Sequence, residues 1–261
     1  MDMQKKIEEL EKTVKHQDII LTELLSLVQD MAENQLGRHC KCPFCKNVFI
    51  NFKPFGVKPR PNAKCPVCGS LERHRSLLMW MNENGVILPT KHKIRLLHFA
   101  PESSLRQLFE DKENIDYWPV DYNENLIGIR KKVDIQNIDF ESEMFDYIVC
   151  NHVMEHIPND VAAFRELFRV LKKGGELILS VPFNLSREKT FEVPNANTDE
   201  LRIKYFGQKD HVRSYGKDIL ARMERAGFEA ELIIPNQYRS VDEIKRFGLL
   251  KDEVIFRCKK F

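Results

Sequence analysis

Apolar and polar positions follow different periods in the N-terminal and C-terminal parts of the chain. From Ile7 to Met31, apolar residues fill seven of the eight a and d positions of a seven-residue repeat. The eight positions are Ile7, Leu10, Val14, Gln17, Leu21, Leu24, Val28 and Met31. A repeat sustained over this length predicts a coiled-coil helix, which we place at residues 1–36. Because further apolar residues widen its stripe, this helix either self-associates or packs on its own domain.

From residue 94 onward, short apolar runs alternate with helical patterns. The expected strands are residues 94–100, 115–121, 131–138, 144–153, 175–183, 229–235 and 252–261, and the longest helix is 160–175. This alternation predicts an α/β fold with a Rossmann-like, doubly wound, mostly parallel sheet. The last two strands are consecutive, which predicts an antiparallel edge on that sheet.

Two pairs of cysteines precede this region. Cys42 and Cys45 form one C-x-x-C pair, and Cys65 and Cys68 form another. Two such pairs at this spacing predict a tetrahedral zinc site, and the strand and turn patterns between them predict a zinc ribbon over residues 37–72. Cys40 is a nearby alternative for one ligand, as is His39 beside it. Because four thiolates leave no open position on the ion, we expect the zinc to be structural.

The composition narrows the class of protein. The chain has 261 residues, of which 43% are hydrophobic and 31% charged, and its net charge is +2. These values are ordinary for a globular protein, and the charge is too mild to argue for nucleic acid as a partner. No apolar run approaches the roughly 18 residues of a membrane span, and the charged N-terminus lacks the apolar core of a signal peptide. We therefore expect a cytoplasmic protein whose cysteines stay reduced.

The first four expected strands end in residues that can bind a ligand. These strand ends are Ala100-Pro101-Glu102, Asp121-Tyr122, Asp134-Ile135 and Asn151-His152. In open sheets of this type, ligands bind beyond the carboxyl ends of the strands, and an acid ending the second strand suits a ribose diol. The alternative is that polar residues simply flank the strands.

The residues in this region match a known family. Over about residues 94–235 the chain resembles class I S-adenosylmethionine-dependent methyltransferases. The segments that carry the resemblance are LLHFAPESSLRQLF, YWPVDYNENL, FDYIVCNHVMEHIPN and ELFRVLKKGGELILSVPF. The segments CPVCGSLERHR and DHVRSYG are similar to a bacterial subgroup that joins a zinc ribbon to this domain and is associated with surface polysaccharides. The resemblance implies a methyltransferase domain at residues 73–261, with an insertion at about 184–216 that covers the acceptor.

The resemblance also implies S-adenosylmethionine as the cofactor and assigns positions to it. The implied cofactor-binding residues are Phe99, Ala100, Pro101, Glu102, Asp121, Tyr122, Asp134, Ile135, Asn151 and His152. Asp121 would bind the ribose hydroxyls, and Asn151 would lie next to the sulfonium. The first loop of the family is usually acidic and rich in glycine, because the backbone approaches the cofactor closely. Here the loop reads HFAPESS and contains no glycine.

Histidines in the loops are candidates for accepting a proton from the acceptor. An imidazole suits this task because its unperturbed pKa lies near neutrality. His211, in the insertion, and His152 are the candidate catalytic residues. His156 follows four residues after His152, at an expected helix start, and we interpret it as a packing residue.

Basic residues near the same loops suggest the chemistry of the acceptor. Lys209, Arg213 and Tyr215 are the candidate substrate residues, and with Arg73 and Arg75 the cations could hold a phosphate. A solvated surface is the alternative for these charges. We predict O-methylation of a small acceptor, such as a nucleotide-activated sugar or a phosphoramidate decoration, in surface polysaccharide biosynthesis. The alternatives are a zinc-ribbon RNA methyltransferase and a scaffold with a non-catalytic methyltransferase domain.

Overall fold

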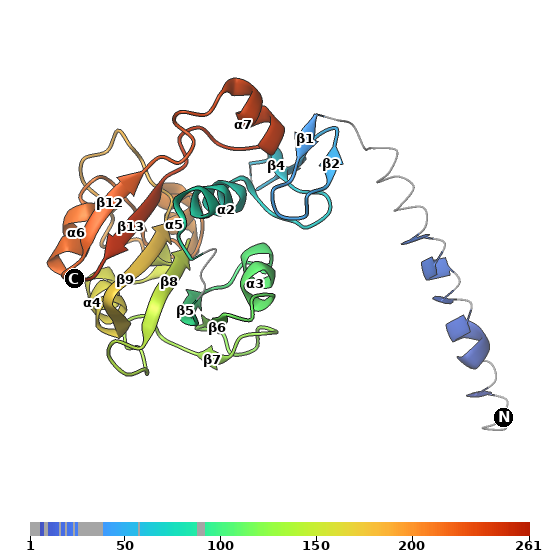
Figure 1. Cartoon of the computed structure of the whole chain (residues 1–261), viewed down its shortest axis with the longest axis horizontal. Helices are drawn as coiled ribbons and strands as arrows, with labels where there is room; N and C mark the ends of the chain where they lie inside the picture. The colour runs from blue at the N-terminus through green and yellow to red at the C-terminus, as the bar shows by residue number, and fades with distance from the viewer. Residues whose placement is uncertain are drawn as a thin grey trace.

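The computed structural model describes residues 39–56, 58–87 and 92–261, together with residues 6, 7, 10–15, 17, 18, 20–22, 24 and 25 (Figure 1). The strands are β1 (Cys40–Lys41), β2 (Val48–Phe49), β3 (Lys53–Phe55), β4 (Arg60–Lys64), β5 (Ile94–Phe99), β6 (Ile115–Asp121), β7 (Lys131–Lys132), β8 (Phe145–Asn151), β9 (Leu171–Ser180), β10 (Phe191–Glu192), β11 (Arg213–Ser214), β12 (Glu229–Ile233) and β13 (Ile255–Lys259). The helices are α2 (Glu72–Asn84), α3 (Ser103–Glu110), the 3-10 helix η1 (Met154–His156), α4 (Asp160–Val170), α5 (Asp199–Phe206), α6 (Ile219–Arg225) and α7 (Val241–Phe247).

A seven-stranded sheet organises the C-terminal part of the chain. Its strand order is β12-β13-β9-β8-β5-β6-β7, and all neighbours from β9 to β7 are parallel. β13 is antiparallel to both β9 and β12, which confirms the expected antiparallel edge. The chain order reverses between β5 and β8, because β6 and β7 follow on one side and β9 on the other. A ligand site is expected beyond the carboxyl ends of the strands at such a reversal.

Helices cover both faces of the sheet (Figure 1). Leu97 and Ile148 belong to the apolar cluster formed with α4 and α6, whereas their chain neighbours Leu96 and Val149 belong to the cluster formed with α2 and α3. Successive strand residues point to opposite faces, so a strand buried on both faces reads as a continuous apolar run. This is why the runs from Ile94 and from Phe145 were recognisable as strands.

The longest helix is shorter than the sequence pattern predicted. The helix expected at 160–175 ends as α4 at Val170, because Leu171 already pairs with Phe145 of the neighbouring strand and is fully buried. The glycine pair expected to end the helix lies inside β9 instead. A Cβ on Gly175 would stand 2.8 Å from the carbonyl oxygen of Asp146, so the close approach of two strands requires glycine there.

The third strand is also shorter than predicted. The strand expected at 131–138 is reduced to β7, Lys131–Lys132. The Asp134 carboxylate accepts the backbone N–H of Gln136 at 2.8 Å, and the Asp134 carbonyl accepts the N–H of Asn137 at 3.0 Å. These bonds close a turn, so Asp134 follows the strand rather than lying inside it.

The segment predicted to be a zinc ribbon, residues 37–72 and called the ribbon below, contains two hairpins, β1–β2 and β3–β4, in its described part. Arg75 of α2 ties these hairpins to the rest of the chain. Its guanidinium is fully buried and donates to carbonyl oxygens on both sides of the expected boundary at residues 72 and 73. The acceptors are Ala63, Ser70, Phe247 and Gly248, at 2.5 to 2.9 Å. Arg75 is therefore a structural residue, and the phosphate-binding role considered for it is wrong.

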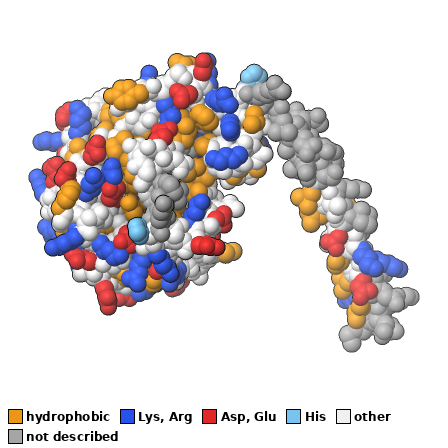
Figure 2. All heavy atoms as spheres, viewed as in Figure 1, with side chains coloured by type: hydrophobic (Ala, Val, Ile, Leu, Met, Phe, Trp, Pro, Cys, Tyr) orange, Lys and Arg blue, Asp and Glu red, His pale blue; other side chains and the backbone are white. Residues whose placement is uncertain are grey.

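The N-terminal segment is helical at each of its described positions. The described apolar a and d side chains are Ile7, Leu10, Val14, Leu21 and Leu24, and each is more than half exposed. Figure 2 shows hydrophobic side chains on the surface of this segment. These side chains do not pack on their own domain, which leaves self-association as the alternative to propose. The predicted positions Val28 and Met31 and the boundary at residue 36 lie outside the described residues. In the described part of the chain, no helix is both long and apolar enough to cross a bilayer.

Candidate active site

Strand register brings the predicted cofactor residues to one edge of the sheet. Phe99 pairs with Val120 of β6 and with Cys150 of β8. The next residues along these three strands are Ala100, Asp121 and Asn151. They therefore follow one row of the sheet, with neighbouring strands about 4.8 Å apart. This row crosses the point where the chain order reverses, as the sequence predicted for the cofactor site.

The first loop makes a sharp turn without glycine. Ala100 has a φ of 46°, in the left-handed region that glycine favours. Its N–H donates to the carbonyl of Val120 at 2.9 Å. Pro101 follows, and Glu102 is the N-cap residue of α3, with a φ of −70°. Ala100 thus adopts a conformation that related loops are expected to reach with glycine. For a residue with a side chain, this conformation costs about 1 to 3 kcal/mol of strain.

The carboxylate of Glu102 lies between two imidazoles. Nε2 of His98 is 3.1 Å from Oε2, and Nε2 of His74 is 3.4 Å from Oε1. Nδ1 of His74 accepts the backbone N–H of Leu71 at 3.2 Å, so its proton resides on Nε2, facing Glu102. Burial opposes ionisation of Glu102, but the contacts with the His74 and His98 imidazoles outweigh it and hold the pKa of Glu102 well below its usual value. Glu102 thereby links the first loop to α2.

The second and third strand ends differ in exposure. Oδ1 of Asp121 accepts the N–H of Asn123 at 2.8 Å, which orients the carboxylate at the strand end. Tyr122 is 70% exposed, which leaves its ring accessible to a ligand such as an adenine ring. Asp134 lies in its turn, and Ile135 is buried in the core below it.

The fourth strand end connects the cofactor edge to a cavity. Oδ1 of Asn151 accepts the hydroxyl of Ser180 at 2.9 Å, and both residues are buried. His152 follows with a φ of 52°, and its N–H donates to the Ser180 carbonyl at 2.8 Å. A left-handed conformation at a non-glycine residue is uncommon and often marks a functional position. His152 lines a cavity of about 1370 Å³.

This cavity is walled by parts that are distant in the sequence. They are the β3–β4 hairpin, the start of α2, the segments after β8 and β9, residues 206–214 of the insertion, and residues 250–254. Its volume is sufficient for a nucleotide-sized molecule. Because the hairpin supplies one wall, the ribbon contributes directly to the cavity as well as to the fold.

Glu155, His156 and His211 meet in the wall of this cavity. The rings of His156 and His211 stack edge to face with centroids 4.7 Å apart. Burial lowers the pKa of His211. The sequence predicted His211 and His152, interpreted His156 as a packing residue and missed Glu155. The signal that could have found Glu155 is the run His152-x-x-Glu155-His156 directly after a buried strand.

Arg213 and Tyr215, predicted to bind substrate, are engaged by the protein. The Arg213 guanidinium is 5% exposed and donates to Glu192 at 2.7 Å and to the carbonyl oxygens of Met154, Ile157 and Pro158. The fully buried Tyr215 donates its hydroxyl to Asp160 at 3.0 Å. These contacts hold β11 against η1 and thus keep His211 beside His156.

Two other cations named from the sequence have different surroundings. Lys209 is exposed in the insertion. Arg73 lines the cavity, and its buried Nε has no hydrogen-bond partner in the described part of the chain. Arg73 is therefore a cation available to an anionic ligand.

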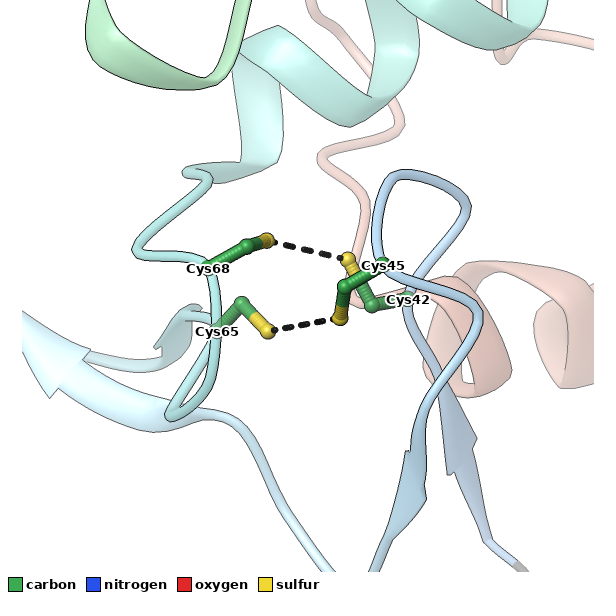
Figure 3. A group of neighbouring side chains, drawn as sticks. All are labelled: Cys42, Cys45, Cys65 and Cys68. Atoms are coloured by element: carbon green, nitrogen blue, oxygen red, sulfur yellow. Dashed lines mark hydrogen bonds between the residues drawn. The ribbon is translucent and has the colours of Figure 1, made fainter. Parts of the chain in front are cut away.

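The four predicted zinc ligands converge from two similar turns (Figure 3). The N–H of Lys46 donates to the Cys42 carbonyl at 2.9 Å, and the N–H of Gly69 donates to the Cys65 carbonyl at 3.1 Å. Lys46 and Gly69 both have left-handed backbones, with φ of 63° and 73°. The two C-x-x-C knuckles, each with a proline directly after its first cysteine, therefore share one conformation.

The sulfur atoms have the spacing that a tetrahedral zinc ion needs. Sγ of Cys42 lies 3.6 Å from Sγ of Cys68, and Sγ of Cys45 lies 3.8 Å from Sγ of Cys65. Four sulfurs at about 2.3 Å from one ion stand about 3.8 Å apart. Cys40, the alternative ligand, instead donates to the carbonyl of Lys245 at 3.7 Å.

Comparison with known proteins agrees with this architecture. The sequence model of a family described as "Methyltransferase domain" matches residues 103–233, just over half of the chain. A ubiquinone biosynthesis O-methyltransferase of Dechloromonas aromatica is 28% identical over 148 residues, which cover 51% of this chain and 62% of the relative. A demethylmenaquinone methyltransferase of Staphylococcus saprophyticus is 35% identical over 71 residues, 23% of this chain and 30% of the relative. The chain thus spans less than two thirds of the length of these curated relatives.

A solved structure shares the fold over nearly the whole chain. The crystal structure of the [4+2]-cyclase SpnF superimposes with a TM-score of 0.50 at 12% identity, covering 92% of this chain and 94% of SpnF. At this identity the likeness concerns the fold alone. The family match, the sheet order and the convergence of strand ends at its reversal together show that the chain belongs to the methyltransferase domain family and carries a class I S-adenosylmethionine-dependent methyltransferase domain.

Proposed function

We propose that the protein uses S-adenosylmethionine to methylate an oxygen atom of a small molecule bound in the cavity. The observation that carries this proposal is the shared row of Ala100, Asp121 and Asn151 beside a cavity lined by His152 and His211. The family supports the methyl donor. The similarity to a ubiquinone biosynthesis O-methyltransferase supports oxygen as the acceptor atom.

The residues of the sheet edge would hold the donor. Asp121 would accept hydrogen bonds from the ribose hydroxyls, and Asp134 and Ile135 would border the adenine. The left-handed turn at Ala100 lets the backbone approach the methionine part. When bound, S-adenosylmethionine supplies the methyl group: the acceptor oxygen bonds to carbon as the sulfur–carbon bond breaks and leaves its electron pair on sulfur. The role of the chain is to position both partners and to take the proton of the acceptor hydroxyl.

His152 is the residue to which we assign that proton. It directly follows the sheet edge, and its side chain is 29% exposed where it lines the cavity. Its Nδ1 lies 3.3 Å from Oε1 of Glu155, and its Nε2 is buried and has no hydrogen-bond partner in the described part of the chain. A carboxylate on one ring nitrogen orients the imidazole and leaves the other nitrogen to accept a proton. His211 lies deeper, beside His156, and we consider it separately below.

The acceptor that we propose carries a phosphate or a related anion. Arg73 lines the cavity and has a buried guanidinium nitrogen without a hydrogen-bond partner in the described part of the chain, and Lys209 adds positive charge on the insertion. The cavity has room for a nucleotide-activated sugar. A phosphoramidate decoration of surface polysaccharide fits the same chemistry, and such a role agrees with a cytoplasmic protein.

Calorimetry with S-adenosylmethionine tests the donor. Absence of binding to zinc-replete protein would contradict the enzyme and leave the scaffold. Methyl transfer from labelled donor to nucleotide sugars, phosphoramidates, quinol precursors and short RNA tests the acceptor. Transfer to RNA would identify the alternative RNA methyltransferase. Transfer only to acceptors without an anionic group would exclude the phosphate-bearing class. In that case Arg73→Met should leave the KM for the acceptor unchanged.

We also propose that the ribbon holds a structural zinc ion and that the N-terminal helix self-associates. The sulfur spacing of 3.6 and 3.8 Å supports the first. The exposed apolar a and d side chains support the second. Sedimentation of the full chain and of a chain with Leu10, Leu21 and Leu24 changed to Lys would measure self-association; equal masses for both would exclude it.

A further inference from the structure

Glu155 is a buried carboxylate without hydrogen bonds. The residue is 1% exposed, and neither Oε1 nor Oε2 has a hydrogen-bond partner in the described part of the chain. An ionised carboxylate removed from water costs several kcal/mol unless a cation or donors compensate it. The nearest group of possible positive charge is His152, whose Nδ1 is 3.3 Å from Oε1. This leaves Oε2 with no compensation.

Two further histidines face this carboxylate. One ligand atom each of Glu155, His156 and His211 lies within 4.8 Å of the others. An ion at about 2.1 Å from each would bring these atoms to about 3 to 4 Å apart, a change within reach of side-chain rotation. The cluster combines a loop after β8 with the insertion, and the bond from Val212 N–H to the Glu155 carbonyl, 2.8 Å long, holds these two parts together.

The hydrogen bonds of His156 leave one ring nitrogen suited to a metal. Its Nδ1 is 3.1 Å from the carbonyl oxygen of Asp210. A carbonyl oxygen only accepts, so Nδ1 carries the proton and Nε2 carries the lone pair. Ligating histidines are commonly oriented by such a bond from the other ring nitrogen to a carbonyl. His211 is 5% exposed, so its ring is also held in place by packing.

We propose that Glu155, His156 and His211 bind a divalent first-row transition-metal ion in the cavity wall, at a site separate from the ribbon cysteines. Two imidazoles and one carboxylate suit Zn²⁺, Fe²⁺ or Co²⁺ better than Mg²⁺ or Ca²⁺, which prefer oxygen ligands alone. Three protein ligands leave coordination positions open toward the cavity. A carboxylate has two oxygens, so Glu155 can bind the ion and still face His152.

The ion would act on the acceptor. This role rests on the proposed function, whereas the site itself does not. A hydroxyl bound to a divalent ion loses its proton more readily, and two adjacent oxygens on one molecule can occupy two open positions. The site therefore favours acceptors with neighbouring oxygen atoms, such as a sugar diol or a catechol-like ring. His152 is left as the proton acceptor.

Cobalt titration of the full-length protein tests the site without using catalysis. Protein carrying one Zn²⁺ per chain is titrated with Co²⁺ and followed by visible absorption. We expect one further equivalent to bind, with the absorption of nitrogen- and oxygen-ligated cobalt. A thiolate-to-cobalt charge-transfer band would instead mark exchange into the ribbon. No saturable binding outside the ribbon would overturn the proposal.

Variants then assign the ligands. Glu155→Gln and His211→Ala should each weaken cobalt binding at least about tenfold. Glu253→Gln is the matched control, because it removes a carboxylate from the same cavity outside the cluster, and cobalt binding should be unchanged. Unchanged binding in Glu155→Gln would overturn the ligand assignment. Calorimetry with S-adenosylmethionine on the same samples separates the two proposals, since either ligand can bind without the other.

Discussion

The guanidinium of Arg75 stacks on the ring of Phe52, with its central carbon 3.9 Å from the ring centroid. Phe52 belongs to the ribbon and Arg75 to the helix that covers the sheet, so this contact joins the two parts. The same guanidinium donates to four carbonyl oxygens. The ribbon is therefore held to the methyltransferase domain by one buried side chain as well as by α7, which packs on β1.

Replacing Arg75 should destabilise the whole chain. Arg75→Met keeps much of the apolar stem but removes the donors of four carbonyls, and each unsatisfied buried acceptor costs about 1 to 3 kcal/mol. We expect a loss of more than about 3 kcal/mol in the free energy of unfolding, measured by urea denaturation. Arg246→Met is the control, because Arg246 is exposed, and it should change stability by less than about 0.5 kcal/mol. Equal small losses of stability in the two variants would show that the buried Arg75 side chain contributes little to the free energy of unfolding.

Removing zinc should disturb the acceptor cavity more than the cofactor edge. In the proposed zinc site the four cysteines would hold the two knuckles together, and the β3–β4 hairpin is one wall of the cavity. After chelation, we expect hydrogen exchange to rise throughout residues 40–70 while β5 and β8 stay protected. Cys68→Ser should reproduce this effect. Cys40→Ala should not, because Cys40 lies outside the sulfur cluster; increased exchange in both variants would contradict a four-cysteine site.

The first loop should become more stable when glycine is introduced. Ala100 holds a φ of 46°, which glycine adopts without strain. Ala100→Gly should therefore raise the free energy of unfolding by about 1 kcal/mol, read as a higher Tm. Ala163→Gly, in the middle of α4, should lower it by about 1 kcal/mol. A loss of stability in both variants would mean that the left-handed turn at Ala100 is not strained.

The strands and the row of residues at their carboxyl ends could be predicted because they depend on local patterns. Runs buried on both faces, such as Ile94–Phe99, are mostly apolar, and a polar residue at the end of a run, such as Asp121, marks its carboxyl end. Parallel register then places Ala100 beside Asp121 without further information. The end of α4 could not be predicted, because Leu171 fits a helical pattern equally well and pairs with Phe145 only in the folded sheet.

The approach of His211 to Glu155 and His156 could not be predicted from local patterns. His211 reaches Glu155 because Arg213 is bound by carbonyl oxygens in and after η1, and the position of a carbonyl group cannot be read from the sequence. The same limitation applies to Arg75, which looks like a surface cation beside Arg73 but is fully buried. Sequence patterns identified residues capable of chemistry, whereas tertiary contacts decided which of them stay available to a ligand.

Lowering the pH should destabilise the protein in two steps, the first from His74 and the second from Glu102. Burial lowers the pKa of His74 from 6.5, so the folded state resists its protonation and stability falls as pH decreases through about 6.5. The pKa of Glu102 is held below its ordinary 4.5 by His74 and His98, so its stabilisation is present above pH 4.5 and is lost below it. His74 also lies near Arg73 and His152, which oppose its protonation further.

Urea denaturation at pH 8, 6 and 4 measures this dependence. Glu102→Gln should be less stable at pH 8 and should show a smaller loss below pH 4.5. Asp139→Asn is the control, because Asp139 is an exposed carboxylate paired with Lys131 on the surface. An unchanged pH profile in Glu102→Gln would show that the pair of imidazoles does not stabilise this carboxylate.

Asp121 should decide the affinity for S-adenosylmethionine. Asp121→Asn keeps an oxygen to accept the N–H of Asn123 but removes the charge that the ribose hydroxyls would meet. Hydrogen bonds to charged groups contribute about 1.5 to 3 kcal/mol, so we expect Kd to rise about 10- to 100-fold in calorimetry. Asp116→Asn is the matched control: it lies on the same strand, is paired with Arg130 and is remote from the carboxyl end, so Kd should not change. If Asp121→Asn binds as tightly as the unmodified protein, the ribose does not lie at the end of β6.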